Sequence, residues 1–334
     1  MNTFNLIAKL TAIHGPSGRE NAVAQAIAEI AKPYADDITI DTLGNVIVHK
    51  RGNGPKLMFA AHMDSIGLIV SYIEEDGSLR VGRVGGVRPS AIMNMPVRFA
   101  NGTLGTVRAH GKADANNLTI DDLYLDIGAA NRADAQSRVQ IGDVAVYGTT
   151  AFQTGNCIVT PYLDNRVSCA VQLLALERLK ENTNDLYFVF TVQEEIGGRG
   201  AKTSSYSIDP DFGVALDVTI AADTPGAKRV CSVDMGKGAA IKVMDGSLVA
   251  HPKMVERMTA LAKEKNIKHQ LEVLTAGGTD AGQIHQSRNG VVSGVISIPC
   301  RYVHTPTEMA DLDDIENCVA LTVALSECDL SKGM

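Results

Sequence analysis

Tryptophan is absent from this sequence of 334 residues, and aromatic residues make up only 4% of it. This scarcity argues against a sugar-binding cleft, and therefore against a glycosidase that uses a carboxylate pair. Long apolar runs are also missing, since none approaches the roughly 20 residues that a membrane helix requires. The N-terminus lacks the basic region and apolar core of a signal peptide. We therefore expect a cytoplasmic protein.

Basic clusters and paired cysteines are missing as well. The net charge is -7, which argues against nucleic acid or anionic lipid as the main partner. The six cysteines are scattered without a CxxC pair, a pattern typical of reduced thiols rather than of a disulfide framework. A hydrophobic fraction of 45% with 21% charged residues excludes wholesale disorder.

The order of predicted helices and strands indicates one domain inserted into another. Residues 4–10 and 21–31 have helical apolar spacing, and Ser17 is a candidate cap for the second helix. Short β segments separated by turns fill 68–155, which predicts a small β barrel or sandwich. After Pro161, strands alternate with helices, as in a largely parallel or mixed sheet covered on both faces. The predicted fold is therefore α/β, a mixed central sheet flanked by helices with an inserted β domain.

Two adjacent carboxylates, Glu194 and Glu195, follow the apolar strand predicted at 188–192. Neighbouring residues on a strand point to opposite faces, so both can serve one site only where the strand ends. The glycines at 197, 198 and 200 supply that ending. A hydrolytic metal site needs such a pair, one carboxylate to hold the metal and one to take a proton from metal-bound water. The ordinary alternative is a solvated acidic turn.

Other metal-ligand residues follow further predicted strands, where sites form in sheets of this kind. These residues are His62, Asp64, Asp217 and His304, and a further candidate, Asp164, comes immediately before a predicted long helix. Each has an ordinary interpretation when taken singly: His62 as a core histidine and Asp164 as a helix cap, for example. Together they indicate a two-metal site, for which histidine and carboxylate ligands favour zinc, cobalt or manganese over magnesium or calcium.

The chain resembles metallopeptidase family 42, the di-zinc, TET-type aminopeptidases related to bacterial glutamyl aminopeptidase. The motifs that carry this resemblance are AHMD, LDNR, QEEIGGRGA, ALDVT, GGTDAG and RYVHTPTE, in family order over essentially the whole chain. The resemblance implies that Asp164 bridges two divalent metals, zinc first, with cobalt or manganese as alternatives. Glu195 and His304 would complete one metal and His62 and Asp217 the other. Glu194 would be the general base, and Asp64 would orient the His62 imidazole.

The resemblance also implies a zinc-peptidase type of catalytic domain, formed by residues 1–67 and 158–334. The inserted β-barrel domain, 68–157, would mediate dimerisation, and dimers would build a tetrahedral dodecamer that acts on peptides with free N-termini. Many family members have an acidic residue where this chain has Ser65. Arg88, Lys237 and Arg301 could attract an acidic substrate side chain, although surface or structural roles are open for each.

Alternative functions remain open from the residues alone. One is a related di-metal deacylase or carboxypeptidase, and another is a glycosidase, whose activity would survive a chelator. A third is a non-catalytic, metal-stabilised assembly. A chain that had lost catalysis would be free to lose Glu194 or Asp64, and this sequence retains both.

Overall fold

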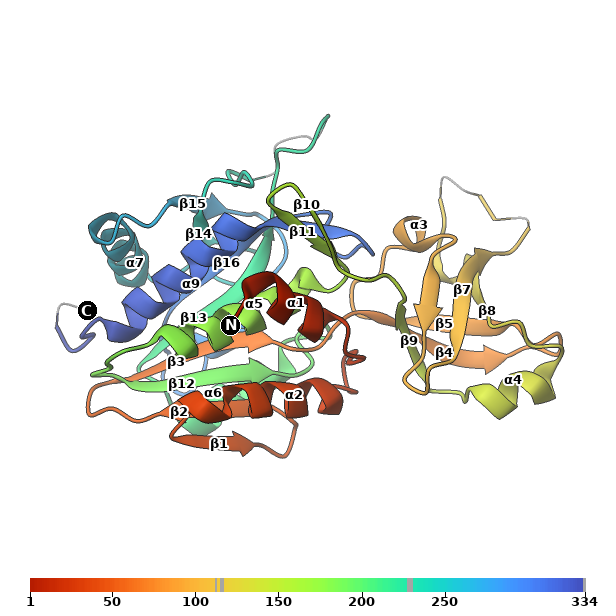
Figure 1. Ribbon diagram of the computed structural model, residues 1–334, viewed down its shortest axis with the longest axis horizontal. Coiled ribbons are helices and arrows are strands. Elements are labelled where there is room, and N and C mark those ends of the chain that lie inside the picture. Colours follow the sequence, from red (N-terminus) through yellow and green to blue (C-terminus); the bar gives the residue numbers. More distant parts are fainter. Residues whose placement is uncertain (112, 115–116, 227–230, 333–334) are drawn as a thin grey trace.

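The computed structural model describes residues 1–111, 113–114, 117–226 and 231–332. Figure 1 shows a larger body containing both chain ends and, at its side, a smaller body made mainly of strands. Among the described residues, every helix is too short or too polar to cross a membrane.

A mixed sheet of eleven strands, counted over the described residues, forms the centre of the larger body. Its strands are β1 (Asp37–Ile40), β2 (Val46–Lys50), β3 (Lys56–His62), β10 (Phe152–Thr154), β11 (Cys157–Thr160), β12 (Asp185–Thr191), β13 (Phe212–Ile220), β14 (Ala239–Met244), β15 (His269–Val273), β16 (Val292–Arg301) and β17 (Glu308–Asp311). The order along the sheet is β1-β2-β12-β3-β13-β16-β17-β11-β10, with β14 joined to β16 and β15 to β14. Parallel pairs lie at the centre, where β12, β3, β13 and β16 are neighbours. The predicted mixed sheet is confirmed.

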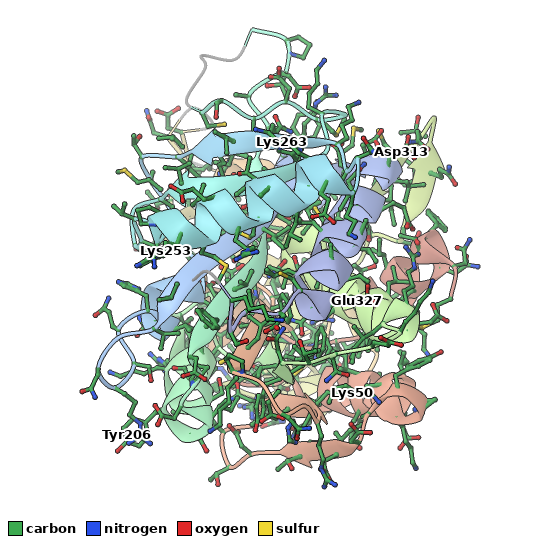
Figure 2. All side chains as sticks on the ribbon, turned by 90° about the vertical axis from the view of Figure 1, so that its left-hand side faces the viewer. Lys50, Tyr206, Lys253, Lys263, Asp313 and Glu327 are labelled. Atoms are coloured by element: carbon green, nitrogen blue, oxygen red, sulfur yellow. The ribbon has the colours of Figure 1, made fainter. Side chains whose placement is uncertain are left out.

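Helices cover both faces of this sheet. They are α1 (Thr3–Thr11), α2 (Asn21–Ala31), α5 (Leu163–Arg178), α6 (Arg199–Ile208), α7 (Pro252–Glu264), α8 (Ala281–Ile284) and α9 (Leu312–Glu327), with a 3-10 turn at Lys32–Tyr34. Alternate residues of β3 show the two layers: Leu57 and Phe59 pack in the main core, whereas Met58 and Ala60 pack under α6 and α8. Figure 2 shows α7, between the labels Lys253 and Lys263, beside α9, between Asp313 and Glu327.

The smaller body is a closed antiparallel barrel with its own apolar core. Its strands are β4 (Gly67–Ile73), β5 (Leu79–Val84), β6 (Pro96–Arg98), β7 (Leu104–Ala109), β8 (Leu123–Asp126) and β9 (Val144–Tyr147), joined in the order β4-β5-β8-β7-β6-β9. Pairing of β9 with β4 closes the barrel. It also carries α3 (Pro89–Ile92), α4 (Arg132–Arg138) and a 3-10 turn at Ile120–Asp122. Of the barrel and the sandwich predicted from the sequence, the barrel is the one formed.

The register of the central strands aligns the ends at which the acidic residues and histidines lie. His62 at the end of β3 is opposite Thr191 at the end of β12, so Glu194 and Glu195 follow directly beside it. Asp217 lies near the end of β13, and the next strand, β16, runs parallel to β13 into the loop that holds His304. The carboxyl ends of four neighbouring strands therefore face one region.

Candidate active site

Six of the predicted side chains line one cavity of about 460 Å³. They are His62, Asp164, Glu194, Glu195, Asp217 and His304. The seventh, Asp64, is fully buried and lies behind His62, with its Oδ1 atom 3.4 Å from the imidazole Nδ1. The structure thus brings together residues that are more than 200 positions apart in the chain. Their individual roles stay predictions.

Asp164 stands at the centre of the group. Its Oδ1 atom lies 3.2 Å from Nε2 of His62, and its Oδ2 atom lies 3.2 Å from Nε2 of His304. Burial opposes ionisation of Asp164, yet the hydrogen bonds from His304 and His62 hold its pKa well below the usual value. One carboxylate therefore presents one oxygen to each imidazole.

The remaining carboxylates divide between the two histidines. Glu195 Oε1 lies 3.3 Å from Nε2 of His304. Asp217 Oδ1 and Glu194 Oε2 each lie 3.8 Å from Nε2 of His62. The site consequently has two halves, one around each imidazole, that share Asp164.

This donor set fits a divalent metal ion. Across the two halves, His62, Asp164 and Glu195 each offer one ligand atom, and the three atoms lie within 4.8 Å of one another. Imidazole nitrogen with carboxylate oxygen is the ligand combination of zinc, cobalt and manganese sites.

Asp64 connects the strand that ends at His62 to the two glutamates. Its Oδ1 atom accepts the backbone N–H of Glu194 at 2.9 Å, and its Oδ2 atom accepts that of Glu195 at 3.2 Å. Oδ2 also accepts the Ser17 hydroxyl at 2.6 Å. The prediction that Ser17 caps the second helix is wrong, because Glu20 is the N-cap of α2 and the Ser17 hydroxyl is engaged with Asp64.

The glycine-rich bend after β12 is required by close packing. The N–H groups of Gly197 and Gly198 both donate to the carbonyl of Glu194 and tighten the turn. A Cβ atom on Gly200 would lie only 2.3 Å from Asn45 Oδ1 and 2.5 Å from the Val192 carbonyl.

Burial raises the pKa of Glu194 well above its usual value, and the nearby Asp217 adds to the rise. The bend thus places Glu194 where a carboxyl group holds a proton more readily than in water.

His304 is held by the smaller body as well as by the sheet. The carbonyl oxygen of Gly86, in the segment between β5 and α3, lies 3.1 Å from the imidazole Nδ1. A Cβ atom on Gly86 would lie 2.5 Å from two atoms of that ring. Only glycine allows this approach, which leaves Nε2 directed at Asp164 and Glu195.

Sequence reasoning missed three buried charged residues beside the site. Lys242 lines the cavity and pairs with Asp245 at 3.1 Å and with Glu272 at 3.2 Å. Asp280, in the GGTDAG motif, accepts the Thr191 hydroxyl, and burial raises its pKa to about 6. Glu308, in the RYVHTPTE motif, accepts two backbone N–H groups. The two motifs held the signal for Asp280 and Glu308, whereas Lys242 had none.

The cations proposed as attractors of an acidic substrate occupy different settings. Arg88 is exposed and lines the cavity. Arg301 is committed to Asp223, to which its Nε and Nη2 atoms donate at 2.9 and 2.6 Å. Arg88 is therefore the better placed of the two arginines to meet a substrate.

Ser65, which stands where many family members have an acidic residue, is buried, and its hydroxyl lies 3.4 Å from the carbonyl of Gly15.

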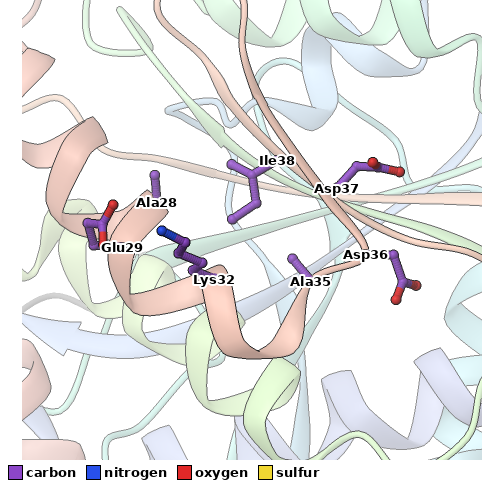
Figure 3. A pocket seen from close by; sticks show the side chains of 7 residues that line it. All are labelled: Ala28, Glu29, Lys32, Ala35, Asp36, Asp37 and Ile38. Carbon is purple, nitrogen blue, oxygen red and sulfur yellow. The ribbon is translucent and has the colours of Figure 1, made fainter.

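A second surface depression, of about 340 Å³, lies between α2 and β1 and is shown in Figure 3. Two of its three acidic residues are in ion pairs: Asp36 pairs with Lys50 at 3.2 Å and Asp37 with Arg51 at 2.6 Å. This depression is a surface feature with satisfied ion pairs, unlike the cavity that gathers the predicted ligands.

Comparison with known proteins agrees with this geometry. Residues 44–321 match the family described as M42 glutamyl aminopeptidase. A putative aminopeptidase of Acetivibrio thermocellus is 47% identical over 321 residues, which are 96% of this chain and 97% of the relative.

Solved structures give the same assignment. An aminopeptidase from the archaeon Desulfurococcus kamchatkensis, APDkam598, superimposes with a TM-score of 0.93 at 40% identity, over 97% of this chain and 94% of that one. The Pyrococcus horikoshii TET1 peptidase, described as able to assemble into a tetrahedron or a large octahedral shell, gives a TM-score of 0.89 at 29% identity, over 97% and 99% of the two chains. The chain belongs to the M42 glutamyl aminopeptidase family and is a metallo-aminopeptidase.

Proposed function

We propose that this aminopeptidase removes N-terminal residues from peptides with two divalent metal ions and with Glu194 as general base. The observation that carries the proposal is the position of Asp164, which presents one carboxylate oxygen to His62 and the other to His304. A shared carboxylate is what two neighbouring dications need, because it reduces their mutual repulsion.

The two halves of the site define the proposed ligand sets. Asp164, Glu195 and His304 would hold one metal, and Asp164, His62 and Asp217 the other. The separations of 3.2–3.8 Å between the nitrogen and oxygen atoms support these sets. When bound, the metals supply Lewis acidity that polarises the scissile carbonyl and makes water more acidic. Zinc is the first choice, and cobalt and manganese accept the same ligands.

Glu194 is the proposed proton carrier. Burial favours its protonated form, so the carboxylate is prepared to take a proton from the attacking water and to donate it to the leaving amine. Asp64 is the proposed positioning group, because it touches His62 and accepts the backbone N–H of Glu194. An imidazole ligand needs such a partner on its other nitrogen to fix the tautomer.

The proposed assembly is a homo-oligomer in which the inserted barrel mediates dimerisation. A twelve-subunit tetrahedral particle built from dimers is supported by the related TET1 peptidase, which can assemble into a tetrahedron. Active sites inside such a particle would be reached by peptides rather than by folded proteins. The domain division at 1–67, 68–157 and 158–334 and the cytoplasmic location also stay predictions.

Hydrolysis of matched free and blocked substrates tests the proposal. The metal-free protein is assayed on aminoacyl-p-nitroanilides and short peptides, free or N-acetylated, with and without added zinc or cobalt. We expect metal-dependent cleavage of the free N-termini only. Equal cleavage of acetylated substrates would show that the free amine is not recognised, and a deacylase or endopeptidase would then replace the aminopeptidase.

A further inference from the structure

Glu308 is a buried carboxylate that lies directly behind the site without lining its cavity. It is the first residue of β17 and pairs with Thr160, the last residue of β11. Only 2% of its surface is exposed. Its Oε2 atom accepts the backbone N–H of Asp164 at 2.9 Å, and its Oε1 atom accepts that of His304 at 2.7 Å.

These two N–H groups belong to different parts of the chain. Asp164 follows β11, whereas His304 lies in the loop between β16 and β17. Both side chains end at the same place, with 3.2 Å between Asp164 Oδ2 and His304 Nε2. Glu308 therefore links the backbones of two residues whose side chains meet inside the cavity.

The link is chemically demanding. His304 has a φ of 62°, in the left-handed region that residues other than glycine adopt only at a cost. His304 is only half-buried, and its backbone N–H has Glu308 Oε1 as its acceptor at 2.7 Å. An N–H left unpaired away from water is costly. A carboxylate satisfies both N–H groups at once. A glutamine has one acceptor oxygen, and its NH₂ group would face the second N–H.

We propose that Glu308 is a positioning residue. By binding the backbone N–H groups of Asp164 and His304, it holds these two residues in place before the metal binds. The inference rests on the proposed ligand sets, in which both residues hold one metal and only Asp164 of the two also holds the other. His62 has separate support from Asp64, so the other half of the site depends less on Glu308. Loss of Glu308 should weaken one metal more than the other.

A metal titration of the apo protein tests this inference. Glu308→Gln is compared with the unsubstituted protein while cobalt is added, and the visible absorption of each bound ion is followed. We expect the affinity of one ion to fall about 10- to 100-fold, the usual effect of losing a group that orients a ligand, and the other to change much less. Hydrolysis should return at saturating cobalt, since every proposed ligand is still present.

Asp314→Asn is a matched control. Asp314 is also a buried carboxylate that accepts two backbone N–H groups, those of Gly236 and Gly238, but it has no contact with the proposed ligands in the part of the chain that the structure describes. Its substitution should leave both cobalt affinities unchanged. An equal loss in the two variants would overturn the inference, because a general loss of packing would then explain both.

His304→Ala separates failure of this inference from failure of the proposed function. If His304→Ala loses an ion and Glu308→Gln binds both ions normally, Glu308 is not a positioning residue. If His304→Ala itself keeps both ions, the ligand set is wrong and the inference falls with it. If Glu308→Gln does not fold, Glu308→Asp is titrated in its place, because the shorter aspartate side chain cannot reach both N–H groups. If neither Glu308→Gln nor Glu308→Asp folds without metal, the inference is overturned and Glu308 has a purely structural role.

Discussion

The carboxylate of Asp64 accepts the backbone N–H of Glu194 at 2.9 Å, although 130 residues separate the two in the chain. The same carboxylate accepts the N–H of Glu195 and contacts the imidazole of His62. Orientation of His62 is the role that the family resemblance implies for Asp64. The structure adds a second contact, with the bend that carries both glutamates.

Asp64→Asn should reduce kcat roughly 10- to 100-fold, as is usual when a group behind a metal ligand is lost. Asparagine keeps one acceptor oxygen, and its NH₂ group would face the N–H of Glu194 or Glu195. KM should change less, because Asp64 is fully buried and does not line the cavity. Steady-state kinetics on an aminoacyl-p-nitroanilide measures both constants.

Ser17→Ala is the matched control for this prediction. It removes one hydroxyl donor from Asp64 Oδ2 and leaves both backbone N–H bonds in place. We expect kcat to fall by no more than a few fold. A loss as large as that of Asp64→Asn would contradict the view that the bonds to Glu194 and Glu195 are the important ones.

The central strands and the set of site residues could be predicted because local patterns encode them. The runs that form β3, β12 and β13 are apolar. His62 ends β3, Glu194 and Glu195 come shortly after β12, and Asp217 lies in the C-terminal half of β13. The rule that sites form at the carboxyl ends of parallel strands then collects His62, Glu194, Glu195 and Asp217 without further information. What this rule cannot give is the register that places His62 opposite Thr191.

The strand-end rule does not find residues whose role depends on contacts with distant parts of the chain. Strand β17 has four residues with acidic groups at both ends and no apolar run, so the only signal for Glu308 is the RYVHTPTE motif that contains it. Asp280 follows a glycine pair rather than an apolar strand, so the strand-end rule does not collect it. The local pattern at Ser17 predicts a helix cap, because its partner Asp64 is 47 residues away.

Glu194→Gln should keep its metals and lose hydrolysis by about 10²- to 10⁴-fold, the usual contribution of a general base. The amide is nearly isosteric with the carboxylate but cannot take up a proton from water. Metal content per subunit after dialysis, measured by mass spectrometry together with kcat, tests both parts of the prediction.

The neighbouring substitution Glu195→Gln is the control for Glu194→Gln. Glu195 Oε1 lies 3.3 Å from His304 Nε2 and belongs to the proposed ligand set, so this variant should lose metal as well as activity. Near-normal turnover of Glu194→Gln would exclude Glu194 as the base. Metal loss in Glu194→Gln would instead assign it to the ligands.

Asp314 should make the stability of the metal-free protein depend on pH. Burial raises its pKa from 3.8 to about 6, even though Gly236 and Gly238 donate to it. Between these two pKa values the native state binds more protons at this group than the unfolded state does. The free energy of unfolding therefore gains a contribution as the pH falls, and this contribution is lost as the pH rises through about 6.

Asp314→Asn removes that contribution, because an amide does not titrate in this range. Denaturant unfolding of both apo proteins between about pH 7 and pH 4 should show the unsubstituted protein gaining stability relative to the variant as the pH falls. Subtracting the two curves cancels titration of the carboxyl groups of the metal site, since Asp314 touches none of these in the described structure. Parallel curves across this range would mean that Asp314 has the same pKa in the native and unfolded chains, and that solvent reaches its carboxylate in the native protein.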